Sequence, residues 1–253
     1  MTKSLKVKKA IKAAYERSGE MWSKLVTVDI RKGNWANWIW AYWFKRAANK
    51  RMVALDVGCG GGRSTVTVAP FVKKVVGIDF SRNSIKYAKK NRKGKNIEYA
   101  VCDVETEPIP GGPSAYDLIV SMCAIHPDCL SAEIVVPKMF QSLKPGGKII
   151  LQFQESNWLK ELNWSNGYTK PEMRRILVRA GFGGIQIVKR ESKLKAPDKL
   201  KLVGFLRDIG ARARIKHHGR KARFERLMES CEKRGRWEFT ESTLFVMAEK
   251  PKV

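Results

Sequence analysis

One short segment constrains the fold more than any other: Asp56–Val57–Gly58–Cys59–Gly60–Gly61–Gly62. It closes an apolar stretch, Met52–Val57, that has the length of a β-strand, and a helical pattern, Ser64–Phe71, follows it. Glycines at alternate positions permit a tight turn and let a ligand approach the main chain, where a side chain would collide. The spacing differs from the G-x-G-x-x-G of nicotinamide-binding loops. The segment therefore predicts a nucleotide-like ligand at the end of the first strand of an α/β sheet.

Strand and helix patterns alternate from residue 52 onward. The expected strands are Met52–Val57, Lys74–Ile78, Ile97–Val101, Tyr116–Met122, Lys148–Phe153, Gly184–Lys189 and Leu244–Glu249. The expected helices between them are Ser64–Phe71, Ser81–Asn91, Ala132–Leu143 and Lys170–Ala180. Strands at this spacing, separated by helices, form a mainly parallel sheet with right-handed crossovers. We expect an α/β fold, a Rossmann-like seven-stranded mainly parallel sheet with helices on both faces.

Three regions follow from this pattern. Residues 1–50 form an N-terminal helical cap that is basic and rich in tryptophan, with helices expected at 5–17 and 34–48. Residues 51–190 and 237–253 form the ligand-binding domain. Residues 191–236 form a basic helical insert before the last strand, and this insert is a candidate substrate-binding element.

Acidic residues stand at the ends of the next two strands as well. Asp79, followed by Phe80, ends the second strand, and a carboxylate there can accept hydrogen bonds from both hydroxyls of a ribose. Asp103, followed by Val104, ends the third strand, where an adenine amino group would lie. Three acids at three successive strand ends, together with the glycine loop, indicate an adenosine-containing ligand.

The segments ALDVGCGGG, VVGIDFS, AVCDVE, YDLIVSMCAIH and LKPGGKIILQF resemble the class I S-adenosylmethionine-dependent methyltransferase family. The resemblance implies that the cofactor is S-adenosylmethionine. We expect no metal site, because the cysteines form no CxxC pair. The resemblance also implies glycine-loop contacts to the methionine part, Asp79 on the ribose, and Asp103 and Val104 on the adenine. Arg31, four residues before Trp35, resembles a basic residue placed over the methionine carboxylate, and Arg63 competes for that role. The expected cofactor-binding residues are Asp56, Gly58, Cys59, Gly60, Gly62, Arg63, Asp79, Phe80, Asp103, Val104, Ser121 and Arg31.

Methyl transfer from a sulfonium releases a neutral leaving group, so the protein supplies little beyond orientation, desolvation and removal of a substrate proton. The expected place for catalytic side chains is the end of the fourth strand. We predict His126 there as substrate contact or base, oriented by Asp128, while a structural histidine packing the following loop stays open. The (Asn/Asp)-Pro-Pro-Tyr segment of the amino-methylating branch is absent, which argues against exocyclic amines of adenine or cytosine as acceptors.

The net charge of +26 points to a polyanionic partner, although it also suits simple solubility. Residues 1–52 hold 13 Lys and Arg against 3 acids, and residues 189–236 hold 17 against 6. We favour RNA, bound through these two segments, and Tyr15 and Ala124–Ile125–His126 resemble the branch that methylates wobble uridines in tRNA.

The alternative is a small molecule or lipid at an anionic membrane surface, as in the quinone and sterol branch. A non-catalytic role in ribosome assembly ranks last, because the loop is intact. A protein activator stays open.

The sequence lacks a run of 18 apolar residues and the apolar core of a secretory signal. Its five cysteines form no CxxC pair, which disfavours a disulfide framework and favours a reducing compartment. We expect a cytoplasmic location, with a mitochondrial one as the alternative.

Overall fold

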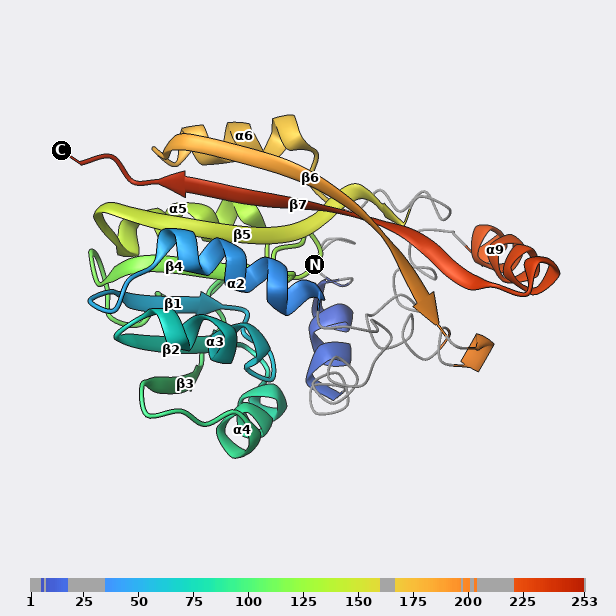
Figure 1. Ribbon diagram of the computed structural model, residues 1–253, viewed down its shortest axis with the longest axis horizontal. Coiled ribbons are helices and arrows are strands. Elements are labelled where there is room, and N and C mark those ends of the chain that lie inside the picture. Colours follow the sequence, from blue (N-terminus) through green and yellow to red (C-terminus); the bar gives the residue numbers. More distant parts are fainter. Residues whose placement is uncertain are drawn as a thin grey trace.

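The structure, a computed structural model, describes residues 6, 8–17, 35–159, 167–196, 198–200, 203 and 221–252. Its centre is a seven-stranded sheet in the order β3-β2-β1-β4-β5-β7-β6 (Figure 1). The strands are β1 Val53–Val57, β2 Lys74–Asp79, β3 Ile97–Val101, β4 Tyr116–Met122, β5 Leu143–Leu159, β6 Gly183–Ala196 and β7 Trp237–Glu249. Strands β1 to β5 run parallel, and β7 lies between β5 and β6 and is antiparallel to both. The expected seven-stranded, mainly parallel sheet is confirmed.

Helices cover both faces of the sheet, as expected. On one face, α2 (Trp35–Ala47) and α3 (Arg63–Val68) bury apolar side chains against β1, β4 and β5. On the other face, α5 (Ala132–Ser142) and α6 (Lys170–Arg179) do the same. Strands β1 and β4 are buried almost throughout, which explains their nearly continuous apolar sequences. Pro70 ends α3 early, so the expected helix to Phe71 finishes as a 3-10 turn over Ala69–Phe71.

Helix α4 (Arg82–Asn91) connects β2 to β3 and lies beside that edge of the sheet (Figure 1). Its apolar face is narrow, since only Ile85 and Ala88 are buried apolar residues, and Ser81 caps its N-terminus by accepting from the Ser84 amide. The helix begins directly after β2, so its first turn lies at the carboxyl edge of the sheet and its last turn points away from that edge.

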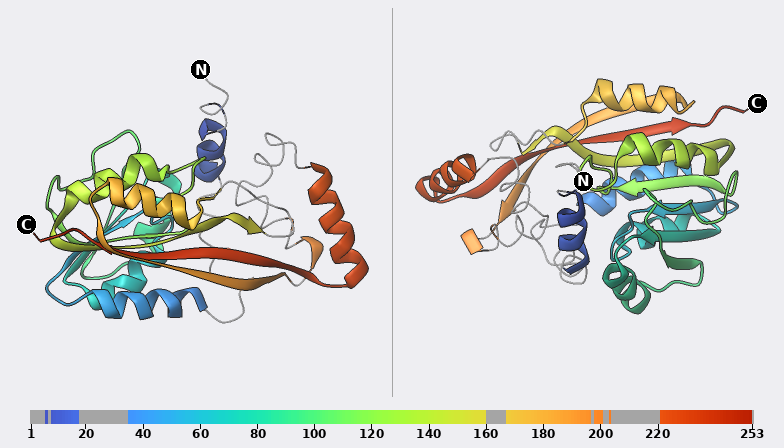
Figure 2. Two further views of the ribbon diagram at one scale, coloured as in Figure 1. Left: turned by 90° about the horizontal axis from the view of Figure 1, so that it is seen from above. Right: turned by 180° about the vertical axis from the view of Figure 1, so that it is seen from behind.

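The structure corrects the expected start of the helical insert at residue 191. Strand β6 continues to Ala196, and β7 begins at Trp237 rather than at Leu244, with Arg190–Ala196 paired to Trp237–Thr243. This two-stranded arm projects past the carboxyl ends of the parallel strands and carries α9 (Lys221–Arg234) (Figures 1 and 2). The pairing joins residues some forty positions apart, which local periodicity does not reveal. Residues 204–220 of the insert, with most of its basic run, lie outside the described residues.

Candidate functional site

The glycine loop follows β1 and is held by the neighbouring strand. The Gly58 and Cys59 amides both donate to the Ile78 carbonyl, at 2.8 and 3.0 Å. Gly58, Gly60 and Gly62 all have positive φ, a conformation that L side chains rarely adopt. A Cβ at Gly58 would lie 2.3 Å from the Ala124 Cβ, whereas a Cβ at Gly60 would meet nothing within 4 Å. The loop is therefore closely packed against Ala124 at Gly58. At Gly60 it borders open space, which a ligand could enter.

Asp79 ends β2 and fixes this loop through its carboxylate. Its Oδ2 accepts from the Gly60 amide and its Oδ1 from the Ser81 amide, each at 2.9 Å. Burial raises the pKa of Asp79 to about 6, against the lowering effect of these two amides, and the carboxylates of Glu16 and Asp103 raise it further. Each carboxylate oxygen has a second lone pair. Asp79 can thus hold the loop and still accept hydrogen bonds from ribose hydroxyls.

Asp56 and Ser121 secure the strands around the loop. Asp56 is fully buried, and its Oδ2 accepts from the Ser64 and Thr65 hydroxyls at 2.6 Å, which ties β1 to the first turn of α3. Burial raises the pKa of Asp56 to about 6, and its Oδ1 has no hydrogen-bond partner among the described residues. Ser121 is also fully buried and donates to the Val57 carbonyl at 2.8 Å. That hydroxyl joins β4 to β1 and is not exposed for the cofactor contact expected of it.

The N-terminal helix, residues 8–17, lies over the ends of β2 and β3. The Lys12 ammonium is 2.6 Å from Asp103 Oδ2 and 3.2 Å from Glu105 Oε2, and the Lys8 ammonium is 2.6 Å from Glu105 Oε1. The helix is fastened further along by Asn83, whose side-chain amide donates to the Glu16 carbonyl at 2.9 Å. Asp103, the expected partner of the adenine amine, therefore forms an ion pair with a lysine of this helix.

The same helix makes an apolar contact that anchors it. Ile11 is fully buried and packs with Cys129, Tyr15 and Phe80, and the Lys12 ammonium lies 5.4 Å from the centre of the Phe80 ring. Phe80 directly follows Asp79, so the contact forms beside the expected ribose position. Val104 is buried in the main core nearby. The N-terminal helix thus forms a roof over the edge of the sheet where the cofactor is expected.

We expect Ile11→Asp to detach this roof, because a carboxylate at a fully buried apolar position is strongly disfavoured. Trypsin should then cleave the N-terminal lysines at least about tenfold faster, a ratio that corresponds to more than about 1.4 kcal/mol of docking free energy. The matched control is Ala13→Asp, which places the same charge at an exposed position of the same helix. Equal cleavage rates for the two variants would contradict the packing of Ile11.

Arg63 begins α3, directly after the glycine loop. Its guanidinium lies 4.8 Å from the centre of the Trp40 ring, and the Trp40 indole donates to Gln152 Oε1 at 2.5 Å. Both Trp40 and Gln152 are buried, and Gln152 Nε2 has no hydrogen-bond partner among the described residues. Arg63 keeps its expected place beside the loop. Arg31, its competitor for the methionine carboxylate, lies outside the described residues.

His126 lies in a tight turn after β4, and its geometry does not favour the expected role of base. Its Nδ1 accepts from the Asp128 amide at 3.1 Å, so the neutral ring carries its proton on Nε2 and has no vacant nitrogen to take another. The Asp128 carboxylate is 3.8 Å from Nδ1, too far for a hydrogen bond. Two main-chain bonds between His126 and Leu130 close the turn. The backbone of Asp128, and not its carboxylate, orients the ring, which supports the structural alternative.

Sequence reasoning missed the contribution of Lys8, Lys12 and Glu105 to the site. The composition of the N-terminal segment predicts a basic surface that includes both lysines. In the structure both form ion pairs with carboxylates. Glu105 is buried and also accepts from the Ser131 amide at 2.7 Å, so it joins the roof to the loop before α5. The spacing of Lys8 and Lys12, four residues apart on a helix, was the available signal, because such residues share one face.

Comparison with known proteins agrees with this geometry. A family model described as a methyltransferase domain matches residues 48–189, more than half of the chain. The chain therefore belongs to the methyltransferase-domain family, whose class I members use S-adenosylmethionine as methyl donor, and this confirms the enzyme class that the sequence resembles.

The mouse mitochondrial ubiquinone biosynthesis O-methyltransferase is 34% identical over 105 residues, which cover 40% of this chain and 28% of that protein. The chain thus matches less than a third of that relative's length. Among solved structures, the YcgJ protein of Bacillus subtilis has a TM-score of 0.64 at 17% identity and covers 85% of this chain and 98% of its own. Phosphoethanolamine N-methyltransferase 2 of Haemonchus contortus, in complex with S-adenosylhomocysteine and phosphomonomethylethanolamine, has a TM-score of 0.58 at 19% identity and covers 87% and 53%. These two structures share the fold.

The residues present fit S-adenosylmethionine. Gly60 offers open space above the loop, Asp79 has lone pairs left for a ribose, and Arg63 supplies a cation for a carboxylate. The bound cofactor supplies an electrophilic methyl group on a sulfonium. The part that the residues of this site would play is to hold and orient the cofactor.

The raised pKa of Asp79 predicts a pH dependence of cofactor binding. Only the ionised carboxylate can accept from the two amides and from ribose together, so affinity should fall as pH drops through about 6. At pH 5 we expect binding about tenfold weaker than at pH 7.5, measured by calorimetry. Stability should change in the opposite sense, because a carboxyl whose folded pKa is raised favours folding at low pH, and that contribution is lost as pH rises through about 6. Affinity that is constant from pH 5 to pH 7.5 would count against Asp79 as the ribose acceptor.

Proposed function

We propose that this chain transfers a methyl group from S-adenosylmethionine to a small-molecule acceptor. The observation that carries the proposal is the roof formed by residues 8–17. Ile11 of this helix is fully buried, and Lys8 and Lys12 of the same helix bind the carboxylates that follow β3. A helix fastened across this end of the sheet would obstruct a bulky polymer more than a compact acceptor.

The names of two similar proteins support a small acceptor. One is an O-methyltransferase of ubiquinone biosynthesis, and the other methylates phosphoethanolamine. The first protein is similar to this chain over part of its length, and the second shares only the fold. The acceptor of this chain is therefore a proposal.

RNA is the second candidate acceptor, and the specific observation in its favour is charge. The chain has a net charge of +26, and exposed cations cover α4 and the loop that follows it. The N-terminal segment, expected to bind RNA, contributes less than its composition suggests, because Lys8 and Lys12 face inward.

The test is transfer of tritiated methyl groups from S-adenosylmethionine into fractionated cell extract. We expect label in the organic and small-molecule fractions and none above background in purified total RNA. The control is the Asp79→Ala chain, which removes the carboxylate that holds the loop and should give no label in any fraction. Label confined to RNA would overturn the small-molecule proposal in favour of the second candidate.

A further inference from the structure

One strongly cationic surface takes no part in the site described above. Between Ser81 and Ile97 the sequence has no acidic residue. We define the α4 face as the six exposed cations of this segment, which are Arg82, Lys86, Lys89, Lys90, Lys93 and Lys95. None of the ion pairs formed among the described residues uses a cation of this face. Its positive charge is therefore not neutralised within the described part of the chain.

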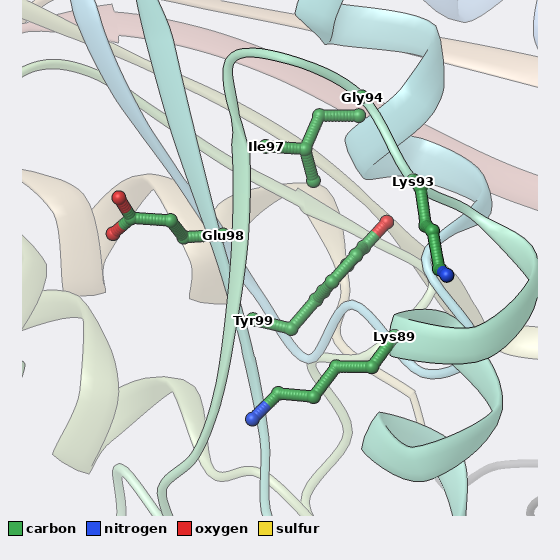
Figure 3. Close-up of a pocket in the computed structure, with 6 residues that line it drawn as sticks. All are labelled: Lys89, Lys93, Gly94, Ile97, Glu98 and Tyr99. Atoms are coloured by element: carbon green, nitrogen blue, oxygen red, sulfur yellow. The ribbon is translucent and has the colours of Figure 1, made fainter.

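A carboxylate that follows the face closely in sequence is bound elsewhere. Glu98 lies on β3, and its Oε1 is 2.8 Å from the Lys74 ammonium on the neighbouring strand. Figure 3 shows its side chain leaving β3 on the side opposite to Tyr99, Lys89 and Lys93. Neither lysine pairs with Glu98 among the ion pairs of the described residues.

A pocket of about 510 Å³ opens between the end of α4 and β3, and its lining includes Lys89, Lys93 and Glu98 (Figure 3). Tyr99 lines it as well, and the Tyr99 hydroxyl donates to the Arg92 carbonyl at 2.9 Å, which fixes the ring. Two ammonium groups beside a hollow with a rigid wall suit an anionic group that enters it. A phosphate satisfies this chemistry, since lysine binds phosphate as a point charge.

We propose that the α4 face is a docking surface for RNA, with one phosphate seated between Lys89 and Lys93. The inference goes beyond the proposed function, since it holds whichever molecule accepts the methyl group. Helix α4 has ten residues and is about 15 Å long, so its cations can contact several phosphates along one strand. Its cations follow the helix and continue into the loop, as a backbone-tracking surface requires.

RNA fits this face better than an anionic membrane does. Peripheral membrane helices combine basic residues with large apolar side chains that enter the lipid. The exposed large hydrophobic side chains among the described residues are Tyr42, Val101, Ile134, Val178, Leu200 and Val203, and none belongs to α4 or to the loop after it. A purely cationic face without such residues matches a phosphate backbone.

The test is binding of fluorescently labelled bulk tRNA, measured by anisotropy over a range of salt concentrations. In the full chain, Lys89→Gln with Lys93→Gln should weaken binding roughly tenfold at 0.1 M salt. It should also reduce the slope of log affinity against log salt by about 0.7 to 0.9, the value for one lost phosphate contact. The matched control is Arg175→Gln with Arg179→Gln, two exposed cations at the same spacing on α6, which should change binding less than twofold.

Two further measurements, calorimetry and vesicle sedimentation, complete the test. Calorimetric affinity for S-adenosylmethionine should be the same in both double variants and the unchanged chain, which separates this inference from the proposed function. Equal losses in both double variants would show an effect of net charge alone and would overturn the proposal. So would an absence of tRNA binding, or sedimentation with vesicles of phosphatidylserine and phosphatidylcholine in place of tRNA binding.

Discussion

Asp79→Ala is expected to reduce the affinity for S-adenosylmethionine by at least about 100-fold. The carboxylate does two things at once, because it holds the Gly60 and Ser81 amides and is placed to accept from ribose hydroxyls. Two hydrogen bonds to a charged group contribute about 3 to 6 kcal/mol together, which corresponds to a factor of roughly 10² to 10⁴. Isothermal calorimetry at pH 7.5, above the pKa of about 6, measures the loss.

The matched control for Asp79→Ala is Asp117→Ala. Asp117 also binds a main-chain amide, that of Val53 at 2.8 Å, and pairs with Lys144 at 2.9 Å, but at the amino ends of the strands. Its removal should lower the thermal unfolding temperature and leave cofactor affinity within about twofold, since it is remote from the glycine loop. Unchanged affinity in Asp79→Ala, or equal losses in the two variants, would contradict the position that we assign to the ribose.

Substitution of two neighbouring glycines should separate cofactor binding from stability. Gly60→Ala places a methyl group in open space, so it should cost only about 1 to 2 kcal/mol of backbone strain. That methyl group would stand where the cofactor approaches the loop, and we expect affinity to fall at least about tenfold. Gly62→Ala should instead reduce stability, because its Cβ would lie 2.4 Å from the Tyr99 hydroxyl.

Tyr99 cannot move away easily, since its ring also packs against Gly77 and its hydroxyl is bound to Arg92. We therefore expect Gly62→Ala to lower the free energy of unfolding by about 3 kcal/mol, from overpacking and a φ of 85°. Denaturant unfolding and calorimetry on both variants make the comparison. The cofactor position that we assign beside Gly60 would be contradicted if Gly60→Ala destabilised the chain as much as Gly62→Ala does. It would also be contradicted if Gly60→Ala left cofactor affinity unchanged.

The sheet could be predicted from the sequence because its signals are local. An apolar strand, a glycine loop and an acid at a strand end are all visible within ten residues, as at Asp56 to Gly62 and at Asp79. The same holds for α6, where Thr169 and Glu172 form a capping box at the expected helix start. These elements lie where the sequence places them.

Features that depend on partners distant in sequence were not predictable. The length of β6 and β7 follows from pairing between Arg190–Ala196 and Trp237–Thr243 across the whole insert. The inward turn of Lys12 follows from a carboxylate 91 residues away, at Asp103. One local feature was not predictable either: the Nδ1 atom of His126 accepts from the Asp128 amide two residues ahead, and the residue types alone do not indicate this bond.

The most direct measurement of the central claim is a calorimetric titration of the unchanged chain with S-adenosylmethionine. The arrangement of Gly60, Asp79 and Arg63 predicts one site per chain, with S-adenosylhomocysteine competing for it. A folded chain that gives no binding heat and no shift in unfolding temperature at millimolar S-adenosylmethionine would contradict the assignment of the cofactor site.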